Sequence, residues 1–406
     1  TIMIINALKQ ISPRVAIMII NQLATLFSIP WLAAHLNIDI FGLIATSLIL
    51  IQTGWIVIDW GGINYLSEIW KSKQSINLQN KLITNIIFSK LWLATIYIAF
   101  VTAFLSYDIV NLPWEFFLAL IPAIIFGGIF PLWFYHVTKK PSELVLITFV
   151  MRLIFLISVV KFVNEDSDAL LYLIIFSATI TLITIYAIVR MIFKYNFRMN
   201  CCSHTSAFKH IRNSTSFFIN SLTNNYIQSI WSISLTLTGS PFLIGIYNIS
   251  EQGYRSGNAI SNAISQVIRV NSIYYSLNKT FKFTLFFAMI YFFVACFFYN
   301  ISDSLIKFLF SSDFYSVITI FKMMIVIWLV QSLVRLTNYP ILGKLIGVSK
   351  VHNLNPIFIS LHGVSITFWL LSSNSLFNMV LLLLITSMLQ LLIMIFLILK
   401  NYKELP

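Results

Sequence analysis

Long apolar segments separated by short polar ones run along the whole chain. Each apolar segment has about the 20 residues that an α-helix needs to cross the hydrocarbon core of a bilayer. We predict about twelve such helices, at 13–34, 42–66, 85–106, 113–135, 144–163, 169–193, 211–238, 242–268, 281–301, 317–342, 351–372 and 376–399. A membrane β-barrel would instead show segments of about ten residues with alternating polarity. The pattern therefore predicts an all-α polytopic membrane protein.

Composition supports this interpretation. Hydrophobic residues make up 59% of the 406 residues and charged residues 10%, whereas a soluble domain has about 45–50% and about 25%. Cys201, Cys202 and Cys296 lack metal-ligand spacing and predict no disulfide framework. The histidines are scattered, without a metal-binding motif or a nucleotide-binding loop nearby. We therefore expect neither a bound metal nor a cofactor.

Basic and acidic residues fall on opposite sides of the predicted helices. With a cytoplasmic N-terminus, most Lys and Arg residues lie in inner segments, and the outer segments contain only Lys161 and Lys307. Acidic residues gather in or beside the outer loops: Asp39, Asp108, Glu115, Glu165, Asp166, Asp168, Asp303 and Asp313. The positive-inside rule then predicts that both chain ends are cytoplasmic. The basic loops thus have anionic membrane lipids, and not nucleic acid, as their expected partner.

The chain divides into two halves of six predicted helices each. The longest inner loop, at 194–210, separates a predicted N-terminal lobe, 1–198, from a C-terminal lobe, 199–406. An offset of 203 residues aligns Gly42 with Gly245 and Asn21 with Asn224. Such parallel repeats predict two pseudo-symmetric six-helix lobes around a central cavity.

Four of the predicted helices carry polar stripes at steps of three and four residues, which place these side chains on one helix face. The stripes are Arg14, Asn21, Thr25 and Ser28; Asn213, Ser216, Asn220, Asn224 and Gln228; Glu251, Arg255, Asn258, Asn262, Gln266 and Arg269; and Gln331, Arg335 and Asn338. They could line a cavity or simply form hydrogen bonds between helices, worth about 0.6 kcal/mol each.

Charged residues inside predicted helices are the strongest functional candidates, because each costs at least about 2.5–3.5 kcal/mol to insert. Arg255 and Arg335 are expected to lie too deep in their helices to reach the headgroups. Arg152 lies roughly 12 Å from an end, so headgroup and cavity roles both stay open. Lys90 and Lys322 lie nearer an edge and are expected to extend toward it.

Two acidic residues are candidates for ion coupling. Glu251 lies one turn before Arg255, so it either neutralises that arginine or titrates during transport. Asp59 precedes Gly61 and Gly62, which allow the helix to bend or another backbone to approach. It serves either in coupling or in helix packing.

Arginines among Asn, Gln and Ser side chains indicate a substrate with negative charge and many hydroxyl groups. The planar guanidinium grips phosphate oxygens bidentately and stays charged. A lipid pyrophosphate bearing a sugar chain has this chemistry.

Four short motifs resemble those of a transporter family. LNIDIFGL at 36–43 and DWGGIN at 59–64 resemble the "LG…FGL" and "DFGFN" signatures of Wzx-type O-antigen and polysaccharide flippases, a branch of the multidrug/oligosaccharidyl-lipid/polysaccharide (MOP) exporter superfamily. PLWFY at 131–135 resembles their "P.WFF", and IGIYNISE at 244–251 their "VGIYS.AE". The chain departs from the family where Ser67 and Glu68 replace an expected basic residue.

This resemblance implies a flippase in the bacterial inner membrane. It would move an undecaprenyl-pyrophosphate-linked oligosaccharide repeat unit to the periplasmic leaflet by alternating access, coupled to an ion gradient, with the proton as the expected ion. The polymerase and the chain-length regulator of the same pathway are the expected protein partners. Substrate binding is assigned to Arg255, Arg335, Arg152, Asn224, Gln228, Asn258 and Asn21, and ion coupling to Glu251 and Asp59.

Two other functions stay open. An O-antigen polymerase or another polyprenyl-linked glycosyltransferase would need a sizeable loop outside the membrane, and the sequence contains none. A multidrug exporter of the same superfamily would share the architecture, but its usual cationic substrates do not suit a site lined by arginine.

Overall fold

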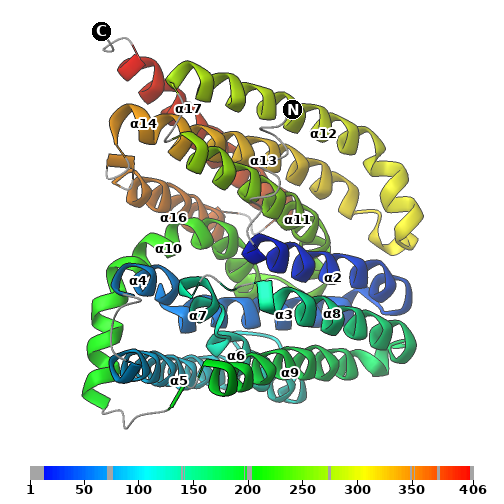
Figure 1. Ribbon diagram of the computed structural model, residues 1–406. Helices are drawn as coiled ribbons and strands as arrows, with labels where there is room; N and C mark the ends of the chain where they lie inside the picture. Colours follow the sequence, from blue (N-terminus) through cyan, green and yellow to red (C-terminus); the bar gives the residue numbers. More distant parts are fainter. Residues whose placement is uncertain are drawn as a thin grey trace. The chain divides into compact units, whose positions relative to one another are not determined.

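The computed structural model describes residues 13–70, 76–138, 140, 142–195, 197–198, 204–272, 276–347, 350–351, 353–372 and 375–402. Throughout these residues the regular secondary structure is helical (Figure 1). Each of the twelve predicted apolar segments coincides with a helix or with two consecutive helices. The all-α prediction is confirmed.

The N-terminal helices are α2 (Pro13–His35), α3 (Ile38–Asp59), α4 (Gly62–Ile69), α5 (Ile76–Ser106), α6 (Trp114–Ile129), α7 (Leu132–Val137), α8 (Ser142–Phe162) and α9 (Ala169–Tyr195). After them come α10 (His204–Thr238), α11 (Pro241–Ser272), α12 (Leu277–Leu309), α13 (Val317–Thr337), a π-helical segment (Asn338–Leu342), α14 (Gly343–Ile346), α16 (Asn355–Ser372) and α17 (Leu376–Tyr402). Short 3-10 turns at Asp166–Asp168 and Ser312–Phe314 precede α9 and α13.

Nine segments in the described part of the chain are long and apolar enough to cross a membrane. They contain α3, α5, α6 with α7, α8, α9, α12, α13 with α14, α16 and α17. The predicted spans at α2, α10 and α11 lie outside this set, and α11 carries the longest polar stripe. The protein is a multi-pass membrane protein.

Three helices break where one continuous span was expected. Between α3 and α4, Trp60 and Gly61 adopt left-handed conformations with φ of 42° and 71°. A Cβ on Gly61 would lie 2.5 Å from the backbone nitrogen of Phe218, so only glycine fits there. Between α6 and α7, Phe130 is extended before Pro131, as the residue preceding a proline prefers. The third break is the π-helical segment that contains Pro340.

Contacts group the chain into two compact units. We call Thr1–Ala34 with Gly245–Pro406 the terminal unit and His35–Ile244 the middle unit. The predicted division into lobes at residues 198 and 199 stays a prediction.

The middle unit is built on α6, which packs against α9, α3 and α5, while α8 packs against α9 and α10 against α5 and α3. Aromatic side chains connect these helices through their polar atoms. Tyr97 donates to the Leu50 carbonyl over 2.6 Å and Trp55 to the Ala123 carbonyl over 2.8 Å. A Cβ on Gly127 would lie 2.1 Å from the Trp55 ring, so α3 and α6 approach closely.

The terminal unit has α13 at its centre, packed against α12 and α17, and α17 packs against α16. A buried amide joins two of these helices. The Gln331 side chain donates to Ser387 over 2.9 Å and to Gln390 over 3.2 Å. Gln331, predicted as part of a polar stripe, therefore has an interhelical packing role.

Candidate functional site

The polar stripe of α11 begins with a buried ion pair. Arg255 Nη2 lies 2.7 Å from Glu251 Oε1, and the Arg255 and Glu251 side chains are 16% and 2% exposed. The four-residue spacing places the two groups one helical turn apart, as predicted. Burial keeps water from screening the pair. Glu251 thus neutralises Arg255 in this state.

Arg335 connects α13 to α11 in the terminal unit. Its Nη1 donates to Asn258 Oδ1 over 2.6 Å. One turn along each helix, the hydroxyl groups of Ser261 and Ser332 lie 2.8 Å apart, and Ser265 donates to the Arg335 carbonyl over 3.0 Å. The predicted stripes of α11 and α13 are therefore joined to each other.

Small residues of α11 leave room for aromatic side chains of α13. A Cβ on Gly253 would lie 2.7 Å from the Phe321 ring, and one on Gly257 would lie 2.5 Å from the Trp328 indole. Gly253, Gly257, Ser261 and Ser265 repeat every four residues, which places them on one face of α11. The predicted polar stripes did not include the two glycines, although their spacing is visible in the sequence.

Helix α2 contacts α11 through Gln22, which lies beside the predicted stripe and not in it. Its side-chain amide donates to Gln252 Oε1 over 2.7 Å. Thr25 and Ser28, in the predicted stripe, bond instead to carbonyl oxygens of their own helix. Asn21, the predicted substrate ligand, lies one residue before Gln22 and is partly buried.

The candidates assigned to substrate binding are divided between the two units. Arg335, Asn258 and Arg255 lie along α11 and α13 in the terminal unit, whereas Arg152 lies on α8 in the middle unit. The guanidinium of Arg152 lies 5.8 Å and 5.4 Å from the ring centroids of Phe155 and Phe176, a cation–π arrangement. The side chains of two candidates, Asn224 and Gln228, lie outside the described residues, as do those of the stripe members Arg14, Asn220, Gln266 and Arg269.

Asp59, whose side chain is 31% exposed, forms a second ion pair at the end of α3. Lys90 Nζ lies 2.8 Å from Asp59 Oδ1 and donates to the Gly128 carbonyl over 3.1 Å. The Lys90 side chain is 4% exposed. Its predicted extension toward a membrane edge is wrong, because its ammonium is held inside the middle unit by Asp59 and the Gly128 carbonyl.

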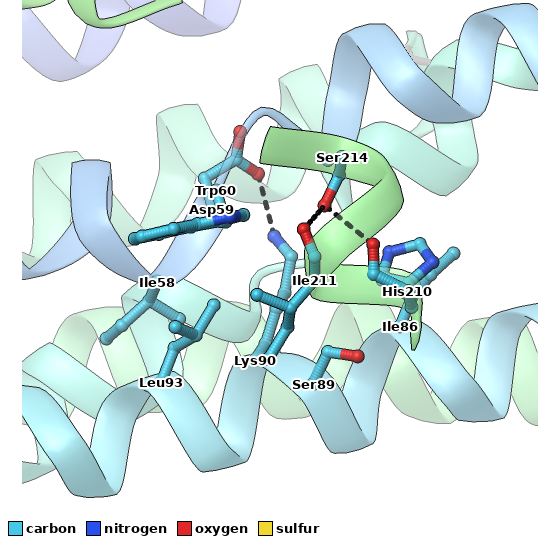
Figure 2. A pocket seen from close by; sticks show the side chains of 11 residues that line it. Ile58, Asp59, Trp60, Ile86, Ser89, Lys90, Leu93, His210, Ile211 and Ser214 are labelled. Atoms are coloured by element: carbon cyan, nitrogen blue, oxygen red, sulfur yellow. Dashed lines mark hydrogen bonds and ion pairs between the residues drawn. The ribbon is translucent and has the colours of Figure 1, made fainter. Parts of the chain in front are cut away.

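A small pocket adjoins this pair (Figure 2). The ammonium group of Lys90 points toward Asp59, and α10 contributes His210 and Ser214 on the other side. The pocket volume is about 10 Å³, close to the space that one water molecule needs. It is therefore too small to hold a sugar or a phosphate group.

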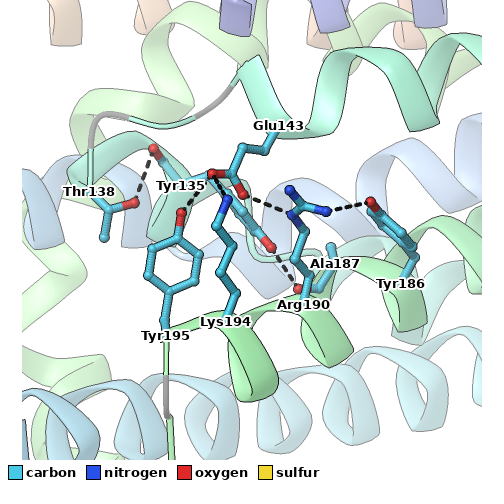
Figure 3. A network of polar contacts seen from close by, with 8 residues as sticks. All are labelled: Tyr135, Thr138, Glu143, Tyr186, Ala187, Arg190, Lys194 and Tyr195. Carbon is cyan, nitrogen blue, oxygen red and sulfur yellow. Dashed lines mark hydrogen bonds and ion pairs between the residues drawn. The ribbon is translucent and has the colours of Figure 1, made fainter.

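A third charged network was not predicted (Figure 3). Glu143, in the first turn of α8, accepts from Arg190 Nε over 2.8 Å and from Lys194 Nζ over 2.6 Å. The hydroxyl of Tyr195 adds a third bond of 3.0 Å. These contacts connect the start of α8 to the end of α9. The pairing residues are 47 and 51 positions apart in sequence, so no local pattern indicates them.

Among the described residues, no three His, Cys, Asp or Glu side chains come together as a metal site. The groups described above that can bind a substrate are the side chains of the ion pairs and of the amide contacts. Arginine is the group among them that suits phosphate oxygens.

Comparison with known proteins identifies the fold. No protein-family model and no curated protein matches the sequence. The structure is similar to the outward-facing conformation of a multidrug resistance MATE family transporter of the MOP superfamily, with a TM-score of 0.60, 11% identity, and 97% and 93% of the two chains covered. For the inward-facing conformation of a multidrug resistance MATE family transporter of the MOP superfamily, the TM-score is 0.60 and the sequence identity is 12%. The match covers 97% of this chain and 99% of that one. For a MATE protein in complex with MaD3S, the TM-score is 0.57 and the sequence identity is 10%. The match covers 97% of this chain and 94% of that one. The chain shares the MATE fold.

Proposed function

We propose that this protein is a transporter that moves an undecaprenyl-pyrophosphate-linked O-antigen or polysaccharide repeat unit from the cytoplasmic to the periplasmic leaflet of a bacterial inner membrane by alternating access. The observation that carries the proposal is the guanidinium of Arg335, held against α11 within the apolar segment Val317–Ile346. Arg335 lies in the last turn of α13, and the segment continues beyond it for roughly 16 Å, through the π-helical turn and α14. Arg255 provides a second guanidinium on α11.

Two properties of these arginines support an anionic substrate. Each costs at least about 2.5–3.5 kcal/mol at membrane depth, so its presence requires a compensating role. Among the described residues Arg335 donates to the neutral amide of Asn258 and forms no ion pair, so its positive charge stays for a substrate to neutralise. Each phosphate group of a pyrophosphate offers a pair of oxygens that the planar guanidinium binds bidentately.

The Glu251–Arg255 pair supplies a route to ion coupling. A pyrophosphate that binds Arg255 competes with Glu251 for the same guanidinium. Glu251, released from its 2.7 Å contact, would exchange a proton, and occupancy of the site would then be linked to protonation. A ligand changes the balance of inward-facing and outward-facing states only through its different affinity for each.

Export of drugs is the second candidate, because MATE structures described as multidrug resistance transporters share the fold. An organic cation requires an accessible carboxylate. Both acids assigned to coupling are already bound, Glu251 to Arg255 and Asp59 to Lys90. This pairing favours the anionic substrate.

The test is a protection assay on purified protein in proteoliposomes. A polyprenyl-pyrophosphate oligosaccharide, added to the outer leaflet, becomes protected from an impermeant glycosidase when it is moved inward. We expect at least a tenfold slower rate for Arg335→Gln and a smaller loss for Arg335→Lys, which keeps the charge without the planar fork. Lys307→Gln, on α12, is the matched control and should keep the wild-type rate.

Three results would contradict the proposal. The first is equal protection with and without the protein. The second is an unchanged rate in Arg335→Gln. The third is efflux of ethidium from drug-sensitive cells by the wild type in the absence of any lipid movement, which would establish the drug exporter instead.

A further inference from the structure

Lys90 occupies a position where two broken helices end. Asp59 is the last residue of α3, and Gly128 is the next to last residue of α6. The ammonium of Lys90, which comes from α5, contacts an oxygen atom of each, at 2.8 Å and 3.1 Å. One buried positive charge thus holds both helix ends.

The two helix ends make this position negative. Carbonyl groups at a helix C-terminus lack their usual donors and carry about half an elementary charge in total. In a continuous helix the Gly128 carbonyl would accept from the amide of Leu132. That amide bonds instead to the Phe130 carbonyl over 2.9 Å, because the chain turns at Pro131. The Asp59 carboxylate adds a full negative charge.

A carboxylate beside the carbonyl of an interrupted helix is also the set of oxygen ligands by which membrane transporters bind small cations. Hard oxygen ligands suit ions such as Na⁺. The ammonium of Lys90 fills the place that such an ion would take. The nearby ionisable groups are Asp59 on α3 and His210 on α10, both lining the pocket (Figure 2).

We propose that Lys90 is a tethered cation, whose ammonium fills a monovalent-cation site formed by the Asp59 carboxylate and the Gly128 carbonyl. The protein itself supplies the charge that a free alkali ion would supply, so this site requires no Na⁺ while Lys90 is present. Removal of the lysine side chain beyond Cβ leaves both oxygens in place and joins their space to the adjacent pocket. The site then becomes open to Na⁺ with bound water. This inference does not depend on which substrate the protein carries.

The experiment measures thermal unfolding of the purified full-length protein in detergent, in NaCl and in choline chloride of equal ionic strength. The wild type should give the same Tm in both salts. Lys90→Ala should unfold several degrees lower in choline chloride, and NaCl should restore part of this loss with a saturable dependence on concentration. A ligand at 100 times its Kd raises stability by about 2.7 kcal/mol, which is easily measured as a shift in Tm.

Two variants serve as matched controls. Lys90→Met removes the charge but keeps most of the side-chain volume, so it should be destabilised without any rescue by NaCl. Asp59→Asn with Lys90→Ala opens the space but lacks the carboxylate, so NaCl should again have no effect. Lys90→Ser, purified throughout in NaCl, replaces Lys90→Ala if the alanine variant does not fold.

Three results would overturn the proposal. One is a Tm of the small-residue variant that does not respond to NaCl. Another is an equal response in Lys90→Met, which would show that Na⁺ acts elsewhere. The last is a Na⁺-specific stabilisation of the wild type that Asp59→Asn abolishes, because a metal ion and not Lys90 would then occupy the site.

Discussion

Glu251 and Arg255 show how burial changes the value of one side-chain contact. The pair is formed by residues four apart on α11, a spacing that on an exposed helix contributes only about 0.2–0.5 kcal/mol. With Glu251 2% and Arg255 16% exposed, removal of either partner leaves the other charge in a poorly hydrated place. Loss of one partner of a buried pair costs about 3–5 kcal/mol.

The first prediction follows from the cost of leaving one buried charge without its partner. Glu251→Gln and Arg255→Gln should each destabilise the protein, and the double variant should be destabilised by less than the sum, because no unpaired charge remains. Unfolding free energies in a double-mutant cycle measure the difference. Additive effects would mean that the two groups do not stabilise each other.

In the transport assay, the rate of the same Glu251→Gln protein should lose its dependence on the pH gradient. An unchanged dependence would reject Glu251 as the coupling residue.

Gly61 and Gly363 form a second comparison between single residues. Gly61 has φ of 71°, and a Cβ there would lie 2.5 Å from a backbone nitrogen that cannot move aside. Around Gly363, in α16, a Cβ would meet nothing within 4 Å. Alanine lowers the conformational entropy of the unfolded chain at both positions, but its Cβ fits the folded structure only at Gly363.

The second prediction is therefore that Gly61→Ala lowers Tm and Gly363→Ala leaves it unchanged or raises it. Alanine in the interior of a helix is about 1 kcal/mol better than glycine, which sets the size of the gain. At Gly61 the left-handed conformation and the steric clash should cost more than that gain. Thermal unfolding of the two purified variants under one condition decides the matter. Equal stability of both would contradict the hinge geometry between α3 and α4.

At the scale of elements, long apolar runs were enough to predict where helices form, but not where they break. Pro30 and Pro122 lie inside α2 and α6 without ending them, whereas the chain turns at Pro131. The same residue type has both outcomes, because neighbouring helices can satisfy the backbone groups that a proline frees in a membrane. Gly61 gave a clearer signal, since its left-handed conformation, with φ of 71°, favours glycine.

The candidate site was predicted only in part for a related reason. Helical periodicity placed Glu251, Arg255 and Asn258 on one face of α11, because that information is local. The partners of Asn258 and Asp59, Arg335 and Lys90, are 77 and 31 positions away and come from other helices. Single-sequence periodicity contains no information about such pairs.

The third prediction concerns the contact between α8 and α9. Glu143 and its partners Arg190 and Lys194 are 15%, 34% and 45% exposed, so water screens these pairs. Glu143→Gln should therefore cost no more than about 1 kcal/mol, and the loss should shrink at high salt. Glu115→Gln, on the exposed first turn of α6, is the matched control. A loss as large as that of Glu251→Gln would show that the network is more deeply desolvated than its exposure indicates.

At the scale of the whole molecule, this chain shares its fold with proteins that have few residues in common with it. The similarity to a MATE transporter covers 97% of this chain at 11% identity. The order and length of the apolar helices can be kept while nearly all side chains change, so the fold alone does not fix a substrate. Orientation in the membrane is a separate property of the whole chain, because it depends on the balance of basic residues across all loops.

The last prediction tests that orientation on the two ends of α8. Lys140, Arg190 and Lys194 gather near its start, whereas Glu165 and Asp166 follow its end. Ser142 and Ser167 are exposed at these two ends. In a variant whose three native cysteines are replaced by serine, we expect an impermeant maleimide to label Ser167→Cys in cells with an intact inner membrane. Ser142→Cys should react only after that membrane is opened. The reverse pattern would invert the protein and place Glu143 and its partners on the periplasmic side. Substrate would then meet the opposite face first, and the proposed direction of transport would be wrong even if the arginines bind pyrophosphate.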